Sequence, residues 1–191
     1  MKNKKGVIIA ISAPSGTGKT TILKEILRDI PELVFSVSAT TRKKRDDEIE
    51  GVDYFFITED EFKKKIERNK FVEWEKFYDY YYGTYKSFIE DNINTGKSVI
   101  AEIDVKGALS LKKIYPESVL IFIYPPSFDE LEKRLKKRNT ENDSDFKKRI
   151  ERAGMELRLK EKFDYFVENK VLDKAILETE SLIQKIIHGG K

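Results

Sequence analysis

The chain has 191 residues, of which 39% are hydrophobic and 37% are charged, and its 37 basic and 34 acidic residues give a formal net charge of +3. This length favours one domain, or one core with small insertions, and 12 Phe and nine Tyr residues beside many Ile and Leu residues exclude global disorder. Because there is no cysteine and a single histidine, His188, the composition excludes a disulfide framework, a thiolate or multi-histidine metal site and a histidine-based catalytic triad.

The chain begins with a strand pattern that leads into a glycine-containing loop. Val7 to Ile11 form an unbroken apolar run, which is typical of a strand buried on both faces of a parallel sheet. Residues 13–20 read Ala-Pro-Ser-Gly-Thr-Gly-Lys-Thr and match the phosphate-loop pattern G-x-x-x-x-G-K-S/T, except that Ala13 takes the place of the first glycine. In such a loop the backbone N–H groups surround a phosphate chain, Lys19 reaches the β- and γ-phosphates, and the Thr20 hydroxyl binds Mg²⁺. The loop therefore predicts a nucleoside triphosphate site, and the alternative is an ordinary turn before a helix.

The next elements lead to a segment of different composition. A helix follows the loop, with apolar residues at positions 22, 23, 26, 27 and 30, until Pro31, and residues 33–37 predict a short strand. Residues 38–45 are hydroxyl-rich and basic, residues 53–57 and 71–77 have strand patterns, and Thr58 caps a helix that runs to about residue 69. We interpret residues 38–85 as a small β-rich insertion into the core.

From residue 86 onward, strands and helices alternate. The patterns predict helices over about 86–95, 105–114, 145–162 and 172–187, a further helix capped by Ser127, and strands over 98–104, 119–124 and 165–167. This alternation is typical of an α/β fold with a parallel sheet and right-handed crossovers. Ligands of such sheets bind at the carboxyl ends of the strands, where the phosphate loop lies.

Two carboxylates end the predicted strand 98–104. Glu102 and Asp104 are two residues apart, so on a strand they would point to the same face. Such a pair beside the phosphate loop predicts side chains that orient Mg²⁺ or its waters. The alternative is a surface carboxylate pair at a strand end.

The insertion carries candidates for a second substrate. Arg42 and Arg45 follow several hydroxyl residues and predict a second phosphate site, because guanidinium groups bind phosphate in a bidentate manner. A solvated basic loop and a nucleic-acid patch are the alternatives, and the acidic residues 46–48 argue against a continuous nucleic-acid track. Glu73 could accept paired hydrogen bonds from the N–H and NH₂ edge of guanine, or it could be an exposed strand residue. The tyrosines between residues 78 and 85 could contact phosphate or base, or could be structural aromatics.

Four arginines flank the polar segment 139–144, namely Arg134, Arg138, Arg149 and Arg152. They predict either a mobile lid that closes on the transferring phosphate or a salt-bridged helix surface. No apolar run approaches the ~18 residues of a membrane span, and the run after the basic start is too short for a signal sequence. We therefore expect a cytoplasmic protein with neither a membrane nor a nucleic-acid partner.

Taken in order, these motifs resemble guanylate kinase, a family of nucleoside monophosphate kinases, over residues 6–187. A bare phosphate loop occurs in many families, whereas the ordered series that follows it is characteristic of this one. The series comprises Ser38-x-x-Thr41-Arg42-x-x-Arg45, Gly51-x-Asp53-Tyr54-x-Phe56, Phe71-x-Glu73-Trp74, Tyr81-Tyr82-Gly83-Thr84, Glu102-Ile103-Asp104-x-x-Gly107, Arg138-x-Thr140-Glu141, Lys148-Arg149 and Asn169.

The resemblance implies a fold, a reaction and a set of site residues. The fold would be of the P-loop type, with a core over about 1–37, 86–126 and 158–191, a GMP-binding insertion over 38–85 and a helical lid over 127–157. The reaction would convert Mg²⁺–ATP and GMP into ADP and GDP. ATP would be held by Ala13, Pro14, Ser15, Gly16, Thr17, Gly18, Lys19, Thr20, Thr21 and, near adenine, Asn169. GMP would be held by Ser38, Arg42, Arg45, Tyr54, Glu73, Tyr82, Thr84, Glu102 and Asp104.

The resemblance also implies catalytic residues, a metal ligand and alternatives. Phosphoryl transfer would depend on Lys19, Arg42, Arg138 and Arg149. Mg²⁺ would bind Thr20, with Glu102 or Asp104 acting through water. The chain departs from the family pattern at three positions. Ala13 lies in the phosphate loop, Asn139 in the lid, and Lys170 beside the residue expected near adenine. A kinase for another phosphorylated acceptor and a non-catalytic binding module of the same fold are the alternative functions, and the sequence does not indicate an oligomeric state.

Overall fold

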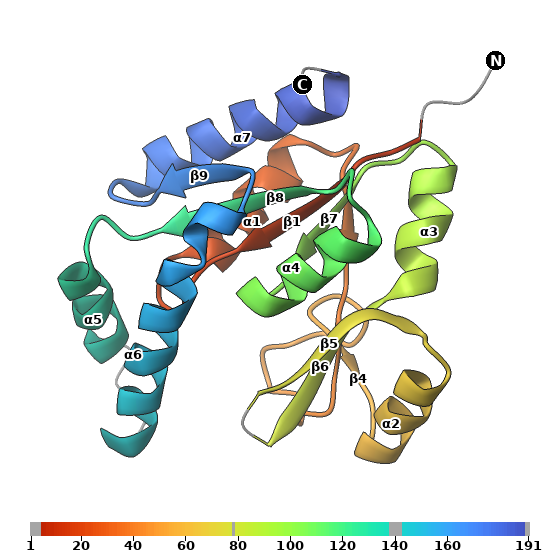
Figure 1. Ribbon diagram of the computed structural model, residues 1–191, viewed down its shortest axis with the longest axis horizontal. Helices are drawn as coiled ribbons and strands as arrows, with labels where there is room; N and C mark the ends of the chain where they lie inside the picture. The colour runs from red at the N-terminus through yellow and green to blue at the C-terminus, as the bar shows by residue number, and fades with distance from the viewer. Residues whose placement is uncertain (1–4, 78, 138–142, 190–191) are drawn as a thin grey trace.

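A parallel sheet lies at the centre of the computed structural model, which describes residues 5–77, 79–137 and 143–189 (Figure 1). The sheet consists of β1 (Ile8–Ser12), β2 (Val34–Ser36), β7 (Val99–Glu102), β8 (Val119–Tyr124) and β9 (Tyr165–Glu168). The strand order is β2-β7-β1-β8-β9, and each neighbouring pair is parallel. The predicted α/β fold with a parallel sheet is confirmed.

Helices cover both faces of this sheet. α1 (Lys19–Asp29) and α7 (Leu172–His188) pack on one face, and α3 (Lys86–Asn94) and α4 (Val105–Ile114) pack on the other. In β1, Ile9 and Ile11 belong to the cluster with α1 and α7, whereas Ile8 and Ala10 belong to the cluster with α3 and α4. Full burial of one isoleucine contributes about 1.5–3 kcal/mol. A strand that is covered on both faces therefore favours the unbroken apolar run seen in the sequence.

A second sheet lies within residues 39–85. It consists of β3 (Ala39–Thr40), β4 (Phe55–Phe56), β5 (Phe71–Phe77) and β6 (Tyr80–Tyr85), in the order β4-β3-β6-β5. α2 (Glu59–Glu67) packs on it, and the Thr58 side chain caps this helix by accepting the Glu61 N–H over 3.2 Å. The ring of Phe62 stacks on Phe71 with 4.4 Å between centroids. This sheet thus has a small aromatic core of its own.

Two further helices lie near the carboxyl ends of β1 and β8 (Figure 1). α5 (Phe128–Lys137) and α6 (Asp143–Arg158) pack together through Leu131, Leu135 and Ala153, and a 3-10 turn follows at Lys160–Lys162. None of the helices in the described ranges combines the length and apolar composition that a bilayer crossing requires.

The start of α4 corrects one prediction. β7 ends at Glu102, so Asp104 does not continue the strand and does not form a same-face pair with Glu102. Instead, Asp104 is the N-cap of α4, and its Oδ1 accepts the Gly107 N–H over 2.7 Å. An N-cap carboxylate satisfies an otherwise unpaired helix N–H group, and this local interaction explains why the strand stops.

Candidate active site

The phosphate loop connects the carboxyl end of β1 to the first turn of α1. Gly16 and Gly18 have φ angles of 85° and 93°, in the left-handed region that favours glycine. A Cβ atom at Gly16 would lie 2.8 Å from the side chain of Leu135, and one at Gly18 would lie 2.6 Å from the amide nitrogen of Asn169. Conformation and space therefore both require glycine here. Ala13 is buried in the cluster on the α1 side of the sheet, so its methyl group contributes to packing.

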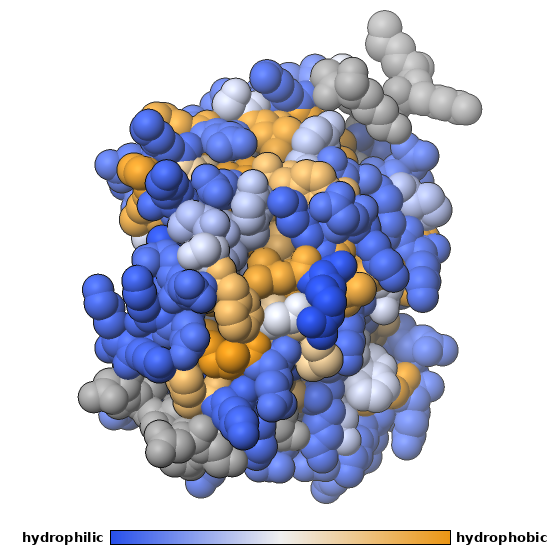
Figure 2. Space-filling model, turned by 60° about the vertical axis from the view of Figure 1, so that its left-hand side comes forward, coloured by the Kyte–Doolittle hydropathy of each residue, from blue (hydrophilic) through white to orange (hydrophobic). Residues whose placement is uncertain are grey.

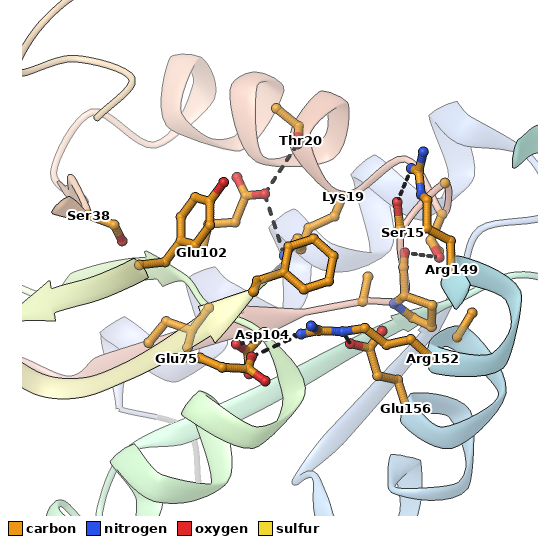
Figure 3. Close-up of a pocket in the computed structure, with 18 of the residues that line it drawn as sticks. Ser15, Lys19, Thr20, Ser38, Glu75, Glu102, Asp104, Arg149, Arg152 and Glu156 are labelled. Atoms are coloured by element: carbon orange, nitrogen blue, oxygen red, sulfur yellow. Dashed lines mark hydrogen bonds and ion pairs between the residues drawn. The ribbon is translucent and has the colours of Figure 1, made fainter. Parts of the chain in front are cut away.

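Lys19 and Thr20 begin α1 and face the end of β7. The Lys19 Nζ lies 3.4 Å from Oε1 of Glu102, and the Thr20 hydroxyl donates to the same oxygen over 3.2 Å (Figure 3). Mg²⁺ in nucleotide sites usually binds one or two carboxylates together with substrate phosphates. Thr20 and Glu102 fit such an ion. Among the described residues, no group of three His, Cys, Asp or Glu side chains could hold a metal without substrate.

Glu73 is a buried carboxylate on β5. The strand pattern allowed an exposed residue here, but a register shift between Phe71 and Glu73 leaves Glu73 only 8% exposed. The Thr84 hydroxyl donates to its Oε1 over 2.5 Å, and its Oε2 lies against Gly107, where a Cβ atom would collide with it. Burial raises the pKa of Glu73 to about 7. The structure thus fixes this carboxylate from two sides.

Two more carboxylates lie near the N-terminus of α4. Oδ2 of Asp104 lies 3.8 Å from Nη2 of Arg152, and Oε2 of Glu75 accepts from the same Nη2 over 3.0 Å (Figure 3). Burial, followed by the neighbouring Asp104 carboxyl, raises the pKa of Glu75. Asp104 is therefore grouped with Glu75 and Arg152, whereas Glu102 is grouped with Lys19.

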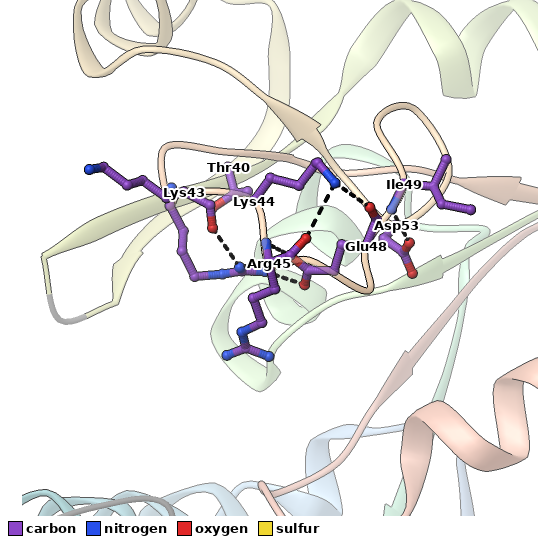
Figure 4. A network of polar contacts seen from close by, with 8 residues as sticks. Thr40, Lys43, Lys44, Arg45, Glu48, Ile49 and Asp53 are labelled. Carbon is purple, nitrogen blue, oxygen red and sulfur yellow. Dashed lines mark hydrogen bonds and ion pairs between the residues drawn. The ribbon is translucent and has the colours of Figure 1, made fainter.

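The two arginines of the insertion have different environments. The Arg42 guanidinium donates to both carboxylate oxygens of Glu48, over 2.6 and 2.9 Å, and this pairing lowers the pKa of Glu48 to about 2. Glu48 also accepts the Arg45 backbone N–H over 2.8 Å. Figure 4 shows the Arg45 side chain pointing away from this network. Arg45 lines the cavity together with Tyr54 and Tyr82, and Arg42 does not.

Two of the arginines expected in a lid lie on α6 and line the site. The Arg149 guanidinium donates to the Ser15 hydroxyl of the phosphate loop over 2.5 Å. Arg152 lies beside the carboxylate group described above. Arg138 lies outside the described residues. The structure therefore places two of the four arginines named from the sequence on the cavity wall.

Asn169 and Thr84 support the cavity from behind it. Asn169 is 4% exposed, and its side-chain amide donates to the Thr17 carbonyl over 2.7 Å. This amide holds the phosphate loop, and the expected contact of Asn169 with adenine stays a prediction. Thr84 is fully buried and positions Glu73 without lining the cavity.

These parts meet in one cavity of about 430 Å³. Its wall unites all eight residues of the phosphate loop, and Thr21 after it, with most of the residues that were expected to bind the acceptor. From the predicted set, the lining residues are Ala13, Pro14, Ser15, Gly16, Thr17, Gly18, Lys19, Thr20, Thr21, Ser38, Arg45, Tyr54, Glu73, Tyr82, Glu102, Asp104 and Arg149.

Several residues of the site were missed from the sequence. Glu75, Phe77 and Glu156 line the cavity, and Glu48 holds both arginines of the insertion loop. Glu48 had one signal, since it is an acidic residue three positions after a basic run. Glu75 had none, because its partner Arg152 lies on another element, whereas Glu156 follows Arg152 by four residues on the same helix, a spacing that the sequence does show.

Fold and cavity together define the class of protein. A phosphate loop at the end of a parallel strand shares its cavity with arginine and tyrosine side chains of the second sheet's segment and is contacted by α6. This is the arrangement of a P-loop phosphotransferase. The family model for guanylate kinase matches residues 4–186. The chain belongs to the guanylate kinase family.

Individual relatives agree with this assignment. Guanylate kinase of Thermotoga maritima is 48% identical over 180 residues, which cover 94% of this chain and 87% of that protein. Guanylate kinase of Mycoplasma genitalium is 48% identical over 183 residues, which cover 95% and 76%. The crystal structure of guanylate kinase from Anaplasma phagocytophilum superposes with a TM-score of 0.79 at 29% identity, covering 96% of this chain and 87% of that one.

Proposed function

We propose that this chain transfers the γ-phosphate of ATP to GMP, giving ADP and GDP, through the cavity described above. Guanylate kinases are ATP:GMP phosphotransferases, and the chain shares nearly its full length with them. The observation that carries the proposal is the joint lining of one cavity by the phosphate loop and by Glu73, a buried carboxylate with two acceptor oxygens.

The donor half of the site holds the triphosphate. The loop N–H groups and the N-terminus of α1 face phosphate oxygens, and Lys19 neutralises charge at the transferring group. Thr20 and Glu102 would hold Mg²⁺, which supplies further positive charge when it is bound. Before substrate binds, Glu102 pairs with Lys19 and accepts a hydrogen bond from Thr20. The incoming phosphates therefore compete with this carboxylate for both side chains.

The acceptor half recognises a phosphate and a base. Arg45 and the phenol groups of Tyr54 and Tyr82 bind the acceptor phosphate. Burial, followed by the charge of Glu102, raises the pKa of Tyr54 to about 12, so this phenol stays a neutral donor. Glu73 accepts hydrogen bonds from the N1–H and the 2-amino group of guanine, and Ser38 and Asp104 lie on the same cavity wall.

Transfer depends on positioning and charge more than on covalent chemistry with the protein. An oxygen of the acceptor phosphate attacks the γ-phosphorus in line, and the bond to the ADP oxygen breaks without a covalent enzyme intermediate. Arg149, which reaches the loop from α6, neutralises charge that develops on the transferring group. Closure of the lid excludes water and limits ATP hydrolysis. The same roles for Arg138 and Arg42, and the cytoplasmic location, stay predictions.

A coupled assay for ADP release tests this function with a panel of acceptors. We expect rapid turnover with GMP and little turnover with AMP, UMP or CMP. IMP lacks the 2-amino group and should be used poorly, because one oxygen of Glu73 then accepts no hydrogen bond from the base. Faster turnover with another monophosphate would show that GMP is not the preferred acceptor. No turnover with any of them would favour a non-catalytic binding module.

A further inference from the structure

Arg152 lies where three parts of the chain meet. It belongs to lid helix α6, and its Nη2 donates over 3.0 Å to Glu75 on β5 of the second sheet. The same nitrogen lies 3.8 Å from Asp104, the N-cap of α4 in the core, and its Nε donates over 2.7 Å to Glu156. Figure 3 shows the three carboxylates around this one guanidinium. All four side chains line the cavity.

The surroundings of Arg152 favour a fixed position. The ring of Phe77, also on β5, lies 4.2 Å from its Cζ atom, within the range of a cation–π contact. Its side chain is 26% exposed, and that of Glu75 is 21% exposed. A planar guanidinium can serve several carboxylates and an aromatic face at once, which an ammonium group cannot do in the same geometry.

Three carboxyl groups surround Arg152, and burial together with Asp104 raises the pKa of one of them, Glu75, to about 7. Glu75, Asp104 and Glu156 supply three carboxylates, and Arg152 is the cation that contacts all three. Without it, Glu75 and Asp104 would face each other across the junction of β5 and α4. That junction also carries the acceptor carboxylate, since Glu73 lies two residues before Glu75 and rests against Gly107 of α4.

We infer that Arg152 is a positioning residue of the acceptor site, through which the lid helix holds β5 and the N-terminus of α4 in register. This inference rests on the proposed function, because it assigns Glu73 and Asp104 to the acceptor. It means that a residue of the lid, which otherwise serves the donor phosphates, also determines how well the acceptor binds. Binding of the two substrates is then coupled through one ion-pair group.

A double-mutant cycle tests the inference on the full chain. At about pH 8, above the raised pKa of Glu75, Arg152→Gln removes the cation and leaves Glu75 and Asp104 to repel each other. The KM for GMP should then rise about tenfold, a range typical of coupled pairs. The KM for ATP should change less than about twofold, and kcat should change little, because no group that touches the transferring phosphate is lost. Glu75→Gln alone should raise the KM for GMP by no more than about threefold.

The double variant gives the decisive comparison. In Arg152→Gln with Glu75→Gln, the repulsion is relieved, and the KM for GMP should return to within about threefold of the unmutated chain. Arg152→Lys should be intermediate, since it keeps the charge but not the planar fork. Lys136→Gln is the matched control, because it removes a cation of α5 whose ion-pair partner, Glu132, lies on the same helix and whose other contact is the ring of Phe146 on α6, away from the cavity wall. That variant should leave both KM values unchanged.

Two outcomes overturn the inference. The first is an unchanged KM for GMP in Arg152→Gln while the unmutated chain phosphorylates GMP normally. The second is a rise in the KM for GMP that becomes larger, not smaller, in the double variant and that follows a fall in melting temperature. That result would indicate loss of stability only. A chain that neither binds nor phosphorylates GMP would overturn the proposed function together with the inference, and calorimetric titration with GMP distinguishes that case.

Discussion

Replacement of Glu73 by Gln tests how the acceptor base is recognised. The substitution keeps the size of the side chain and replaces one carboxylate oxygen by an NH₂ group. The Thr84 hydroxyl donates to Oε1 over 2.5 Å, so the Gln oxygen is expected to take that position and the NH₂ group to face the cavity. Guanine presents donors on the edge concerned, so a donor would meet a donor.

The expected magnitude follows from the burial of this site. A hydrogen bond to a charged group contributes about 1.5–3 kcal/mol, and a buried polar group left without a partner costs about 1–3 kcal/mol. Together they predict a loss of roughly 2.5–6 kcal/mol in the binding of GMP, which corresponds to about 10²–10⁴-fold in kcat/KM for GMP. ATP does not touch this side chain, so its KM should stay within about twofold.

Steady-state kinetics with each substrate varied in turn measures both values. Because burial raises the pKa of Glu73 to about 7, the free protein must lose a proton here before guanine binds. The affinity for GMP should therefore fall as the pH drops below 7 in the unmutated chain. In Glu73→Gln only the weaker dependence that comes from protonation of the GMP phosphate, with a pKa of about 6, should remain. Equal losses for GMP and ATP in the variant, or an unchanged kcat/KM for GMP, would refute the assignment of Glu73 to the base.

Three further predictions concern the loop, the insertion and α4. Lys19→Met should keep the circular dichroism spectrum and melting temperature but lose at least about 10²-fold in transfer, and substantial residual turnover would contradict its role. Since the pKa of Glu48 in the folded chain is about 2, against 4.5 ordinarily, its pair with Arg42 stabilises the fold above pH 4.5 and loses that effect as the pH falls toward 2. Urea unfolding should therefore show Glu48→Gln destabilised at pH 7 and close to the unmutated chain at pH 2.5, and equal destabilisation at both would count against the pair. Gly107→Ala should push a methyl group into Glu73, cost about 1–3 kcal/mol and raise the KM for GMP. Its control, Gly154→Ala, has ordinary space, 3.7 Å from Phe128, and should do neither.

Local patterns predicted most of the fold from the sequence. The phosphate loop needs only consecutive residues, so its strand, its glycines and its helix were all evident. Buried strands were recognised because a parallel sheet covered on both faces selects unbroken apolar runs. The strand at 55–56 lies within the predicted strand 53–57, whereas the strand at 39–40 was not predicted, because two residues carry no periodicity.

Tertiary contacts explain what the sequence did not predict. Asp104 was assigned to a strand because its spacing from Glu102 suited one, and an N-cap hydrogen bond to Gly107 prevailed. Glu73 is buried by a bulge and by its contact with α4, neither of which leaves a trace in the alternation of the strand. The pair of Arg152 and Glu75 joins residues 77 positions apart. Such a pair follows from the fold and cannot be read from one sequence.

The most direct test follows the phosphate itself. The purified chain is mixed with Mg²⁺, GMP and ATP labelled in the γ-phosphate, and the products are separated by ion-exchange chromatography. We predict that the label appears in GDP, that its amount equals the ADP formed, and that Lys19→Met shows neither. Label found in inorganic phosphate, or ADP formed without labelled GDP, would contradict direct transfer from ATP to GMP.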